Sequence, residues 1–257
     1  MSRVSQAARR PGGLRWPAGG PRRLLLSPRF RVPAGILTAA CALITALLGA
    51  EFAGQHGPGW IDRAVDGRLT SALASLNEPL NFIADNTPAA VAVLGVLACC
   101  GCLLTHRPRA ALLVAVTLPA GYLADIGLKA LVNRTLTGFQ SYPSGHTIGA
   151  FSLAVIAAVL LLGPCRPPLR PATRVFLTCA AALAACVVPV AMIATGMHYF
   201  TDTIGGGALA IALVLATALL IDVTGSSIGR RMLGKGFDIL HRLKAGDSSY
   251  YTDGGSS

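Results

Sequence analysis

Charged residues are scarce in this sequence: they fill only 13% of its 257 positions, about half of the share found in soluble domains. Aromatic residues are few at 6%, and acidic residues number 11 against 22 Lys and Arg. Hydrophobic residues make up 53% of the chain instead. This balance argues against a soluble globular domain, a disordered chain and a secreted disulfide scaffold. It favours a membrane protein with several spans, because long apolar stretches need lipid as their solvent.

A metal-binding cluster is missing as well. The chain has seven Cys, an odd number, and most of them lie within apolar runs. The densest group, Cys99, Cys100 and Cys102, has no His or fourth Cys at the spacing of metal ligands. We therefore expect buried thiols that act as small apolar side chains, and a protein that needs no metal or other cofactor.

Six apolar runs account for most of the chain, and each is close to the roughly 17–25 residues that a helix needs to cross a bilayer. They cover residues 34–54, 88–104, 110–132, 147–163, 175–196 and 200–221. Backbone polar groups in lipid must be satisfied within their own segment, which favours helices over open strands. The sequence therefore predicts an all-α fold, an integral membrane bundle of six transmembrane helices.

The distribution of positive charge predicts the topology of these spans. If all six cross the membrane, eighteen Lys and Arg fall on one side, and only Arg63, Arg68, Lys129 and Arg134 fall on the other. The positive-inside rule then places both termini in the cytoplasm of a plasma-membrane protein. Because topology accounts for the net charge of +11, we expect membrane lipids and no nucleic acid as partners.

Three regions follow from this organisation. Residues 1–33 form a basic cytoplasmic segment that we expect to be mobile and attracted to anionic head groups. Residues 34–222 form the six-helix membrane domain, and residues 223–257 form a cytoplasmic tail.

The longest external loop, residues 55–87, carries apolar residues at roughly helical spacing with charged residues between them. The apolar set is Trp60, Ile61, Ala64, Val65, Leu69, Leu73 and Leu76, and the charged set is Asp62, Arg63, Asp66 and Arg68. This pattern predicts an amphipathic helix. Two placements stay open: the helix lies on the membrane surface, or it packs on the protein without lipid contact.

Four cationic or imidazole side chains are expected at one depth on the external side. His146 begins the fourth apolar run, His198 ends the fifth, and Lys129 ends the third with Arg134 five residues later. Three separate helix ends contribute these groups, which a random scatter would seldom produce. We therefore place the candidate site at this end of the bundle.

The residues around these groups suit an oxyanion. Pro143, Ser144 and Gly145 precede a helix whose first N–H groups lack partners, and such a helix end binds anions. Gly145 lets an oxyanion approach the backbone, and Ser144 adds a hydroxyl donor. Lys129 and Arg134 supply positive charge, Arg134 with a fork that matches phosphate oxygens. These residues predict a phosphate-binding site.

His198 and Asp202 are four residues apart, so both lie on one face if a helix begins near them. A carboxylate on one imidazole nitrogen fixes the tautomer and makes the other nitrogen a better nucleophile. His146 can then protonate the leaving oxygen. The pattern predicts phosphoryl transfer with a histidine nucleophile and no obligatory metal. Asp125, one turn before Lys129, is expected to form an ion pair with it.

The order of these motifs resembles the type 2 phosphatidic acid phosphatase superfamily, in its bacterial membrane branch. The superfamily also includes the vanadium haloperoxidases. The resemblance covers about residues 55–222 and depends on three motifs: Lys129 to Arg134, Pro143-Ser144-Gly145-His146, and His198 with Asp202.

This resemblance implies an enzyme that hydrolyses lipid phosphates through a phosphohistidine. His198 would be the nucleophile, Asp202 its orienting partner and His146 the general acid. The residues that would hold phosphate are Lys129, Arg134, Ser144 and Gly145. The substrate would be a phosphomonoester or diphosphate of a phospholipid or polyprenyl lipid at the outer face.

Two positions depart from the family pattern. Leu136 stands where the first motif has Arg, and Met192 stands where the third motif has Arg. Loss of one preorganised donor to a transition-state charge typically costs about 2.7–4 kcal/mol. These departures leave open a catalytically weak or inactive lipid-phosphate-binding protein of the same fold. A second alternative is a phosphotransferase that passes phosphate from the same phosphohistidine to an acceptor other than water.

Overall fold

The computed structural model describes residues 24–164 and 166–246, with side chains up to residue 224. Most of the predicted N-terminal segment and the last residues of the tail lie outside this part. The helices are α1 (Pro28–Glu51), α2 (Trp60–Ala72), α3 (Asn77–Leu104), α4 (Pro108–Val132), α5 (Gly145–Leu162), α6 (Pro171–Ala194) and α7 (Phe200–Gly246). A 3-10 turn, η1 (Ala74–Leu76), precedes α3, and the strands β1 (Thr135–Leu136) and β2 (Phe139–Gln140) follow α4.

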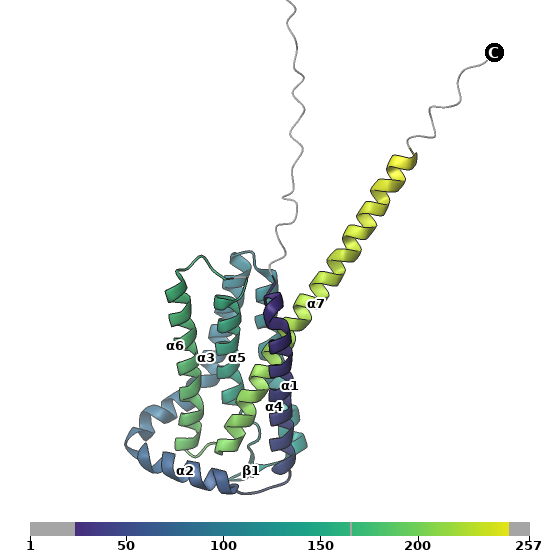
Figure 1. Cartoon of the computed structure of the whole chain (residues 1–257). Helices are drawn as coiled ribbons and strands as arrows, with labels where there is room; N and C mark the ends of the chain where they lie inside the picture. Colours follow the sequence, from purple (N-terminus) through teal and green to yellow (C-terminus); the bar gives the residue numbers. More distant parts are fainter. Residues whose placement is uncertain (1–23, 165, 247–257) are drawn as a thin grey trace, which may run out of the picture.

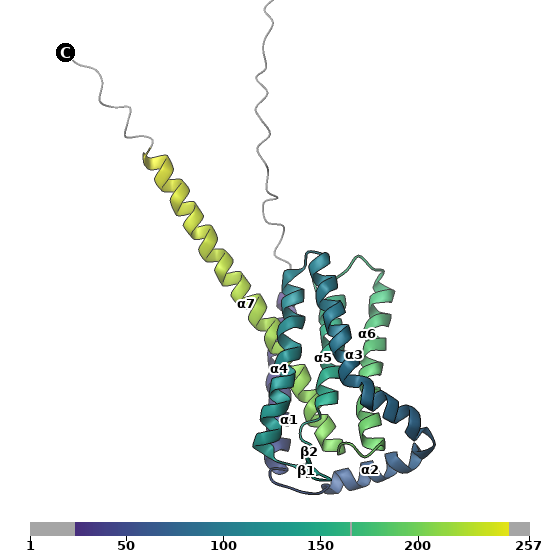
Figure 2. The same ribbon diagram turned by 180° about the vertical axis from the view of Figure 1, so that it is seen from behind.

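All the α-helices except α2 contain a segment long and apolar enough to cross a membrane, which gives six spans within the described residues. They stand side by side, and α2 lies across one end of the bundle (Figures 1 and 2). The predicted all-α bundle of six transmembrane helices is confirmed.

The boundaries of several elements differ from the predicted ones. Helix α3 begins at Asn77, well before residue 88, because Glu78 and Asp85 end the apolar run without ending the helix. The predicted boundary at 33 falls inside α1, and the boundary at 222 falls inside α7.

A short hairpin between α4 and α5 was not predicted. Its two central residues, Thr137 and Gly138, both have positive φ, at 48° and 87°. This is the backbone that two-residue hairpin turns require. The hairpin turns the chain back so that the segment before α5 lies beside Arg134.

Helix α7 packs closely on the segment that leads into α5. A Cβ at Gly205 would lie 2.5 Å from the Tyr142 side chain, and one at Gly206 would lie 2.6 Å from the carbonyl oxygen of Ser144. Glycines here remove the side chains that would keep the two elements apart. The start of α7 and the start of α5 therefore lie side by side, which brings together the two histidine motifs.

At the opposite end of the bundle, Asp222 connects α7 with the chain before α1. Its two carboxylate oxygens accept the N–H groups of Leu25 and Leu26, each at 2.9 Å. Nitrogens of Arg31 and Arg109 each lie 3.9 Å from the same carboxylate. Asp222 is fully buried, so this group holds three separate parts of the chain together.

Asp222→Asn is therefore expected to destabilise the bundle. The new amide keeps one acceptor oxygen, so one buried N–H loses its partner and the two arginines lose a counter-charge. The expected loss is about 1–3 kcal/mol, measured as a lower thermal midpoint in detergent. Arg170→Gln, an exposed charge change in the α5–α6 loop, is the control and should change stability by less than about 0.5 kcal/mol. Equal midpoints for the two variants would contradict this role of Asp222.

Candidate active site

The helix predicted within residues 55–87 is α2, and it packs against α6 and α7. Of its charged residues, Asp62 is fully buried, Asp66 is half-buried, and Arg63 and Arg68 are exposed, whereas the apolar Trp60 is 75% exposed. The packing of α2 on the bundle delivers acidic side chains to the site; the two placements relative to lipid stay predictions.

Asp62 joins the start of α2 to the start of α7. One carboxylate oxygen accepts the N–H of Gly59 at 2.9 Å, and the other accepts the N–H and hydroxyl of Thr201 at 2.9 and 2.8 Å. Burial acts to raise the pKa of Asp62, but these bonds and the Arg134 guanidinium outweigh it and lower the pKa. A carboxylate here also suits the positive end of the α7 dipole.

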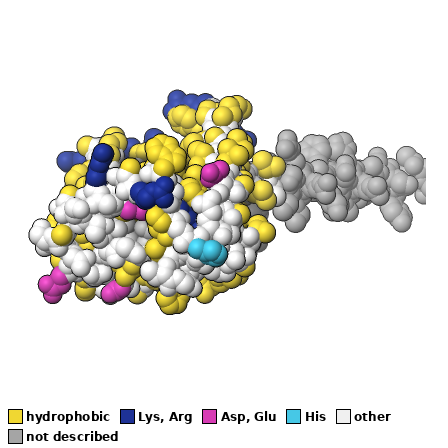
Figure 3. Space-filling view, turned by 90° about the horizontal axis from the view of Figure 1, so that it is seen from below, with side chains coloured by type: hydrophobic (Ala, Val, Ile, Leu, Met, Phe, Trp, Pro, Cys, Tyr) yellow, Lys and Arg dark blue, Asp and Glu magenta, His cyan; other side chains and the backbone are white. Residues whose placement is uncertain are grey.

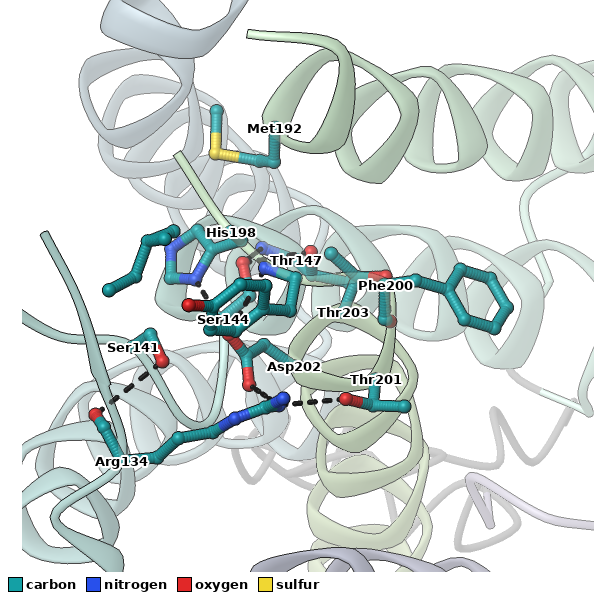
Figure 4. Close-up of polar contacts among 12 residues, drawn as sticks. Arg134, Ser141, Ser144, Thr147, Met192, His198, Phe200, Thr201, Asp202 and Thr203 are labelled. Atoms are coloured by element: carbon teal, nitrogen blue, oxygen red, sulfur yellow. Dashed lines mark hydrogen bonds and ion pairs between the residues drawn. The ribbon is translucent and has the colours of Figure 1, made fainter. Parts of the chain in front are cut away.

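Arg134 is fully buried between two carboxylates (Figure 4). Its Nη2 lies 2.5 Å from Asp62, and its Nη1 donates to Asp202 at 2.6 Å and to Thr201 at 2.7 Å. Its guanidinium carbon also lies 3.9 Å from the centre of the Phe52 ring. Both terminal nitrogens of Arg134 therefore face protein side chains in this structure. The predicted role of Arg134 in holding phosphate stays a prediction.

His198 and Asp202 lie together as their spacing predicted. Asp202 uses its second oxygen to accept the N–H of Tyr199 at 3.2 Å, and the same oxygen lies 3.8 Å from His198 Nδ1. That separation exceeds a hydrogen bond, and within the described residues Nδ1 has no hydrogen-bond partner. Catalytic hydrogen bonds are often long before substrate binds, so Asp202 remains positioned to orient the ring.

His146 and His198 are neighbours. Their ring centroids are 6.1 Å apart with planes inclined by 62°, although one residue begins α5 and the other precedes α7. Each ring lines a different hollow at this end of the bundle.

The first hollow has a volume of about 390 Å³ and lies between α3, α4 and α5. Asp125, Lys129 and His146 contribute its ionisable groups. Much of the remaining wall is apolar and includes Pro88, Val91, Ala92, Leu118 and Ile148. Lys129 Nζ donates to Asp125 at 3.0 Å, which confirms the predicted ion pair.

At the start of α5, where the sequence predicted an anion site, Asp125 lies close to Gly145 and Ser144 caps the helix. A Cβ at Gly145 would lie 2.8 Å from an oxygen of Asp125, so this carboxylate occupies the approach expected for the substrate. Ser144 is fully buried, and its hydroxyl caps α5 by accepting from the N–H and hydroxyl of Thr147 at 3.4 and 3.0 Å. Ser144 therefore acts as a helix cap in this structure.

The second hollow, of about 220 Å³, is lined by His198 together with Arg63 and Asp66 of α2 and Leu136 of the hairpin. Figure 3 shows this end of the molecule, where basic and acidic side chains lie close together near the middle of the face. Burial, and then the negative charge of Asp62, raise the pKa of Asp66 to about 6, although the N–H of Phe200 donates to it at 3.1 Å.

Met192 is one of the two positions that depart from the family pattern, and its surroundings are apolar. Met192 is fully buried in an apolar cluster with Ala84, Ala150 and Val188, and it lies beside His198 (Figure 4). Its carbonyl oxygen accepts the N–H of His198 at 3.2 Å. Met192 thus supports His198 through its backbone, while its side chain fills space.

The sequence interpretation did not select Asp62, Arg63 or Asp66 as site residues. Their signal was present: Asp62 and Asp66 are four residues apart, which places two carboxylates on one helix face. Among the residues that the structure describes, no group of three His, Cys, Asp or Glu side chains could hold a metal ion.

The fold and this site define a multi-pass membrane protein that pairs two histidines at one end of a six-helix bundle. Residues 105–224 match the family model of the PAP2 superfamily. The resemblance seen in the motifs is confirmed.

A solved structure has the same fold. It is described as the first transmembrane PAP2 type phosphatidylglycerolphosphate phosphatase from Bacillus subtilis. The TM-score is 0.58 at 20% identity, and the match covers 70% of this chain and 93% of that one. At this identity the likeness shows the fold alone. No match was found among curated proteins.

Proposed function

We propose that this protein is a lipid-phosphate phosphatase of the plasma membrane, with its active site on the extracytoplasmic side. The observation that carries the proposal is the pair of neighbouring rings, His146 and His198, with Asp202 beside His198 Nδ1. The excess of Lys and Arg at the other end of the bundle supports cytoplasmic termini.

The proposed reaction has two steps. The His198 nitrogen that faces away from Asp202 attacks phosphorus, and the bond from phosphorus to the lipid oxygen breaks. His146 gives its proton to that oxygen, so the lipid alcohol leaves and phosphate stays on His198. A water molecule then attacks phosphorus, His146 takes a proton from it, and the phosphorus–nitrogen bond breaks to release inorganic phosphate.

The first hollow supports a lipid substrate. Its apolar wall extends from His146 and Lys129 between three membrane-spanning helices, so an acyl or prenyl chain can lie there while its phosphate reaches the histidines. Phosphatidate, phosphatidylglycerol phosphate and polyprenyl phosphates or diphosphates are the substrates to test first. The second of these is the lipid named for the similar Bacillus subtilis protein.

Phosphate release by the purified protein in detergent tests this proposal. The three lipids are compared with a chelator present, and His198→Ala is the inactive control. We expect chelator-resistant release that depends on His198. Release that needs an added metal, or that persists in His198→Ala, would contradict the proposed mechanism.

A second candidate is a lipid-phosphate-binding protein with weak or no catalysis. Leu136 and Met192 favour it, because neither can hold a transition-state charge. This candidate requires saturable binding of the lipid phosphates with no release above the His198→Ala control.

Asp66 is expected to make the activity depend on pH. It lines the same hollow as His198, and the charges of Asp62, Asp202 and Arg134 act on its pKa. With a pKa of about 6, it is neutral below that pH and repels a phosphate group above it. Asp66→Asn is expected to raise kcat/KM at pH 7.5 by about fivefold, equivalent to ~1 kcal/mol, with little change at pH 5. Parallel pH profiles for wild type and variant would exclude this effect.

A further inference from the structure

A phosphoryl group that His198 attacks must lie against the hollow that His198 lines. The two cationic side chains that the sequence predicted to bind phosphate do not line this hollow. Lys129 lines the other hollow and is paired with Asp125, and Arg134 is buried between two carboxylates. Leu136 does line the hollow, but it is apolar.

Arg63 is the basic residue among the side chains that line this hollow in the described part of the chain. One of its terminal nitrogens donates to the carbonyl oxygen of Pro58 at 2.8 Å. This bond uses one of the five N–H donors of the guanidinium group. An arginine in a hollow with a nucleophilic histidine matches the bidentate recognition that phosphate favours.

We propose that the hollow between α2 and His198 is the phosphate-binding site, and that Arg63 supplies the cation that the family places at position 136. The inference rests on the proposed phosphatase function and adds to it a residue on α2. In this proposal the cation comes from α2 instead of the hairpin, and both positions, Arg63 and Leu136, line the same hollow.

The neighbouring residue holds Arg63 in place. Asp62 fixes the first turn of α2 to Arg134 and to the N–H of Thr201 at the start of α7. The α2 backbone at Arg63 therefore keeps a constant position relative to the start of α7, which follows His198. Positioning of this kind is what a transition-state contact requires.

The hollow is large enough for a phosphate group, and the acidic side chain that lines it needs a cation beside it. Its volume of about 220 Å³ exceeds several times the ~30 Å³ that a water molecule occupies in the liquid. Asp66 in the same hollow opposes an anion when it is ionised, and Arg63 lies three residues before it on α2. A cation is needed here to offset that carboxylate.

Arg63→Gln tests the proposal, with Arg68→Gln as the matched control. Arg68 is an exposed arginine of the same helix that does not line the hollow. We expect Arg63→Gln to lower kcat/KM by about 100–1000-fold, and Arg68→Gln to leave it near the wild-type value. Adding Leu136→Arg to Arg63→Gln returns a cation to the same hollow and is expected to recover at least tenfold.

Binding of inorganic phosphate tests the assignment of Arg63 separately from the proposed phosphatase activity. We expect phosphate to raise the thermal midpoint of wild type and Arg68→Gln, but not that of Arg63→Gln. Activity or phosphate stabilisation in Arg63→Gln equal to that in Arg68→Gln would overturn the assignment of Arg63. If wild type binds inorganic phosphate through Arg63 but hydrolyses none of the lipid phosphates, the result contradicts the phosphatase function and supports the phosphate-binding site.

Discussion

Arg134→Met is expected to lower the free energy of unfolding by about 3–5 kcal/mol, the usual cost of removing one partner from a buried ion pair. Arg134 is fully buried, and its charge faces Asp62 on one side and Asp202 on the other. Without it, two carboxylates remain in a buried site with no counter-charge. Methionine replaces the unbranched stem of arginine but not its guanidinium group, so the loss reports mainly the missing charge and its hydrogen bonds.

Denaturation in detergent micelles measures this loss, and a second substitution shows its origin. Asp62→Asn alone should destabilise the protein, because Arg134 then has one counter-charge fewer. Combined with Arg134→Met it should be less harmful than the sum of the two single effects, because residues in one ion-pair network couple. Strict additivity, or a normal stability for Arg134→Met, would show that the pair contributes little.

His198→Ala is expected to reduce phosphate release by about 10⁴-fold or more, as loss of a nucleophile does in other covalent mechanisms. No neighbouring group can take its place, since His146 acts on the leaving oxygen and Asp202 pairs with Arg134. The bundle should keep its stability, because His198 Nδ1 makes no hydrogen bond within the described structure. The loss therefore reports chemistry and not unfolding.

Asp202→Asn separates orientation from nucleophilicity in the same assay. It should retain more activity than His198→Ala, because the nucleophile remains while its tautomer is no longer fixed. The thermal midpoint should be measured alongside, because Arg134 loses one of its two carboxylates. Equal activities for wild type and His198→Ala would remove His198 from the mechanism.

The six spans were predictable because hydropathy alone decides which helices lipid can solvate. The start of α3 was not, because a helix can continue past its apolar run with polar first turns. The Lys129–Asp125 pair was predictable from four-residue spacing on a helix. These successes depend on contacts that are local in sequence.

The surroundings of Arg134 depend on contacts that are distant in sequence. Asp62 lies 72 positions before it, and only the packing of α2 across the end of the bundle brings the two together. The spacing of Asp62 and Asp66 marked one face of α2, but not that this face turns inward. For the same reason Arg63 could be assigned to the hollow of His198 only from the structure.

Direct detection of a phosphoryl group on His198 tests the central claim. The protein is mixed with the best lipid substrate, stopped in alkaline denaturant, where phosphohistidine survives, and digested for mass spectrometry of the peptide that contains residue 198. We predict a phosphorylated His198 that appears within the turnover time and is absent from His198→Ala. Rapid phosphate release by wild type with no phosphorylation of His198, or with the group on another residue, would contradict the account.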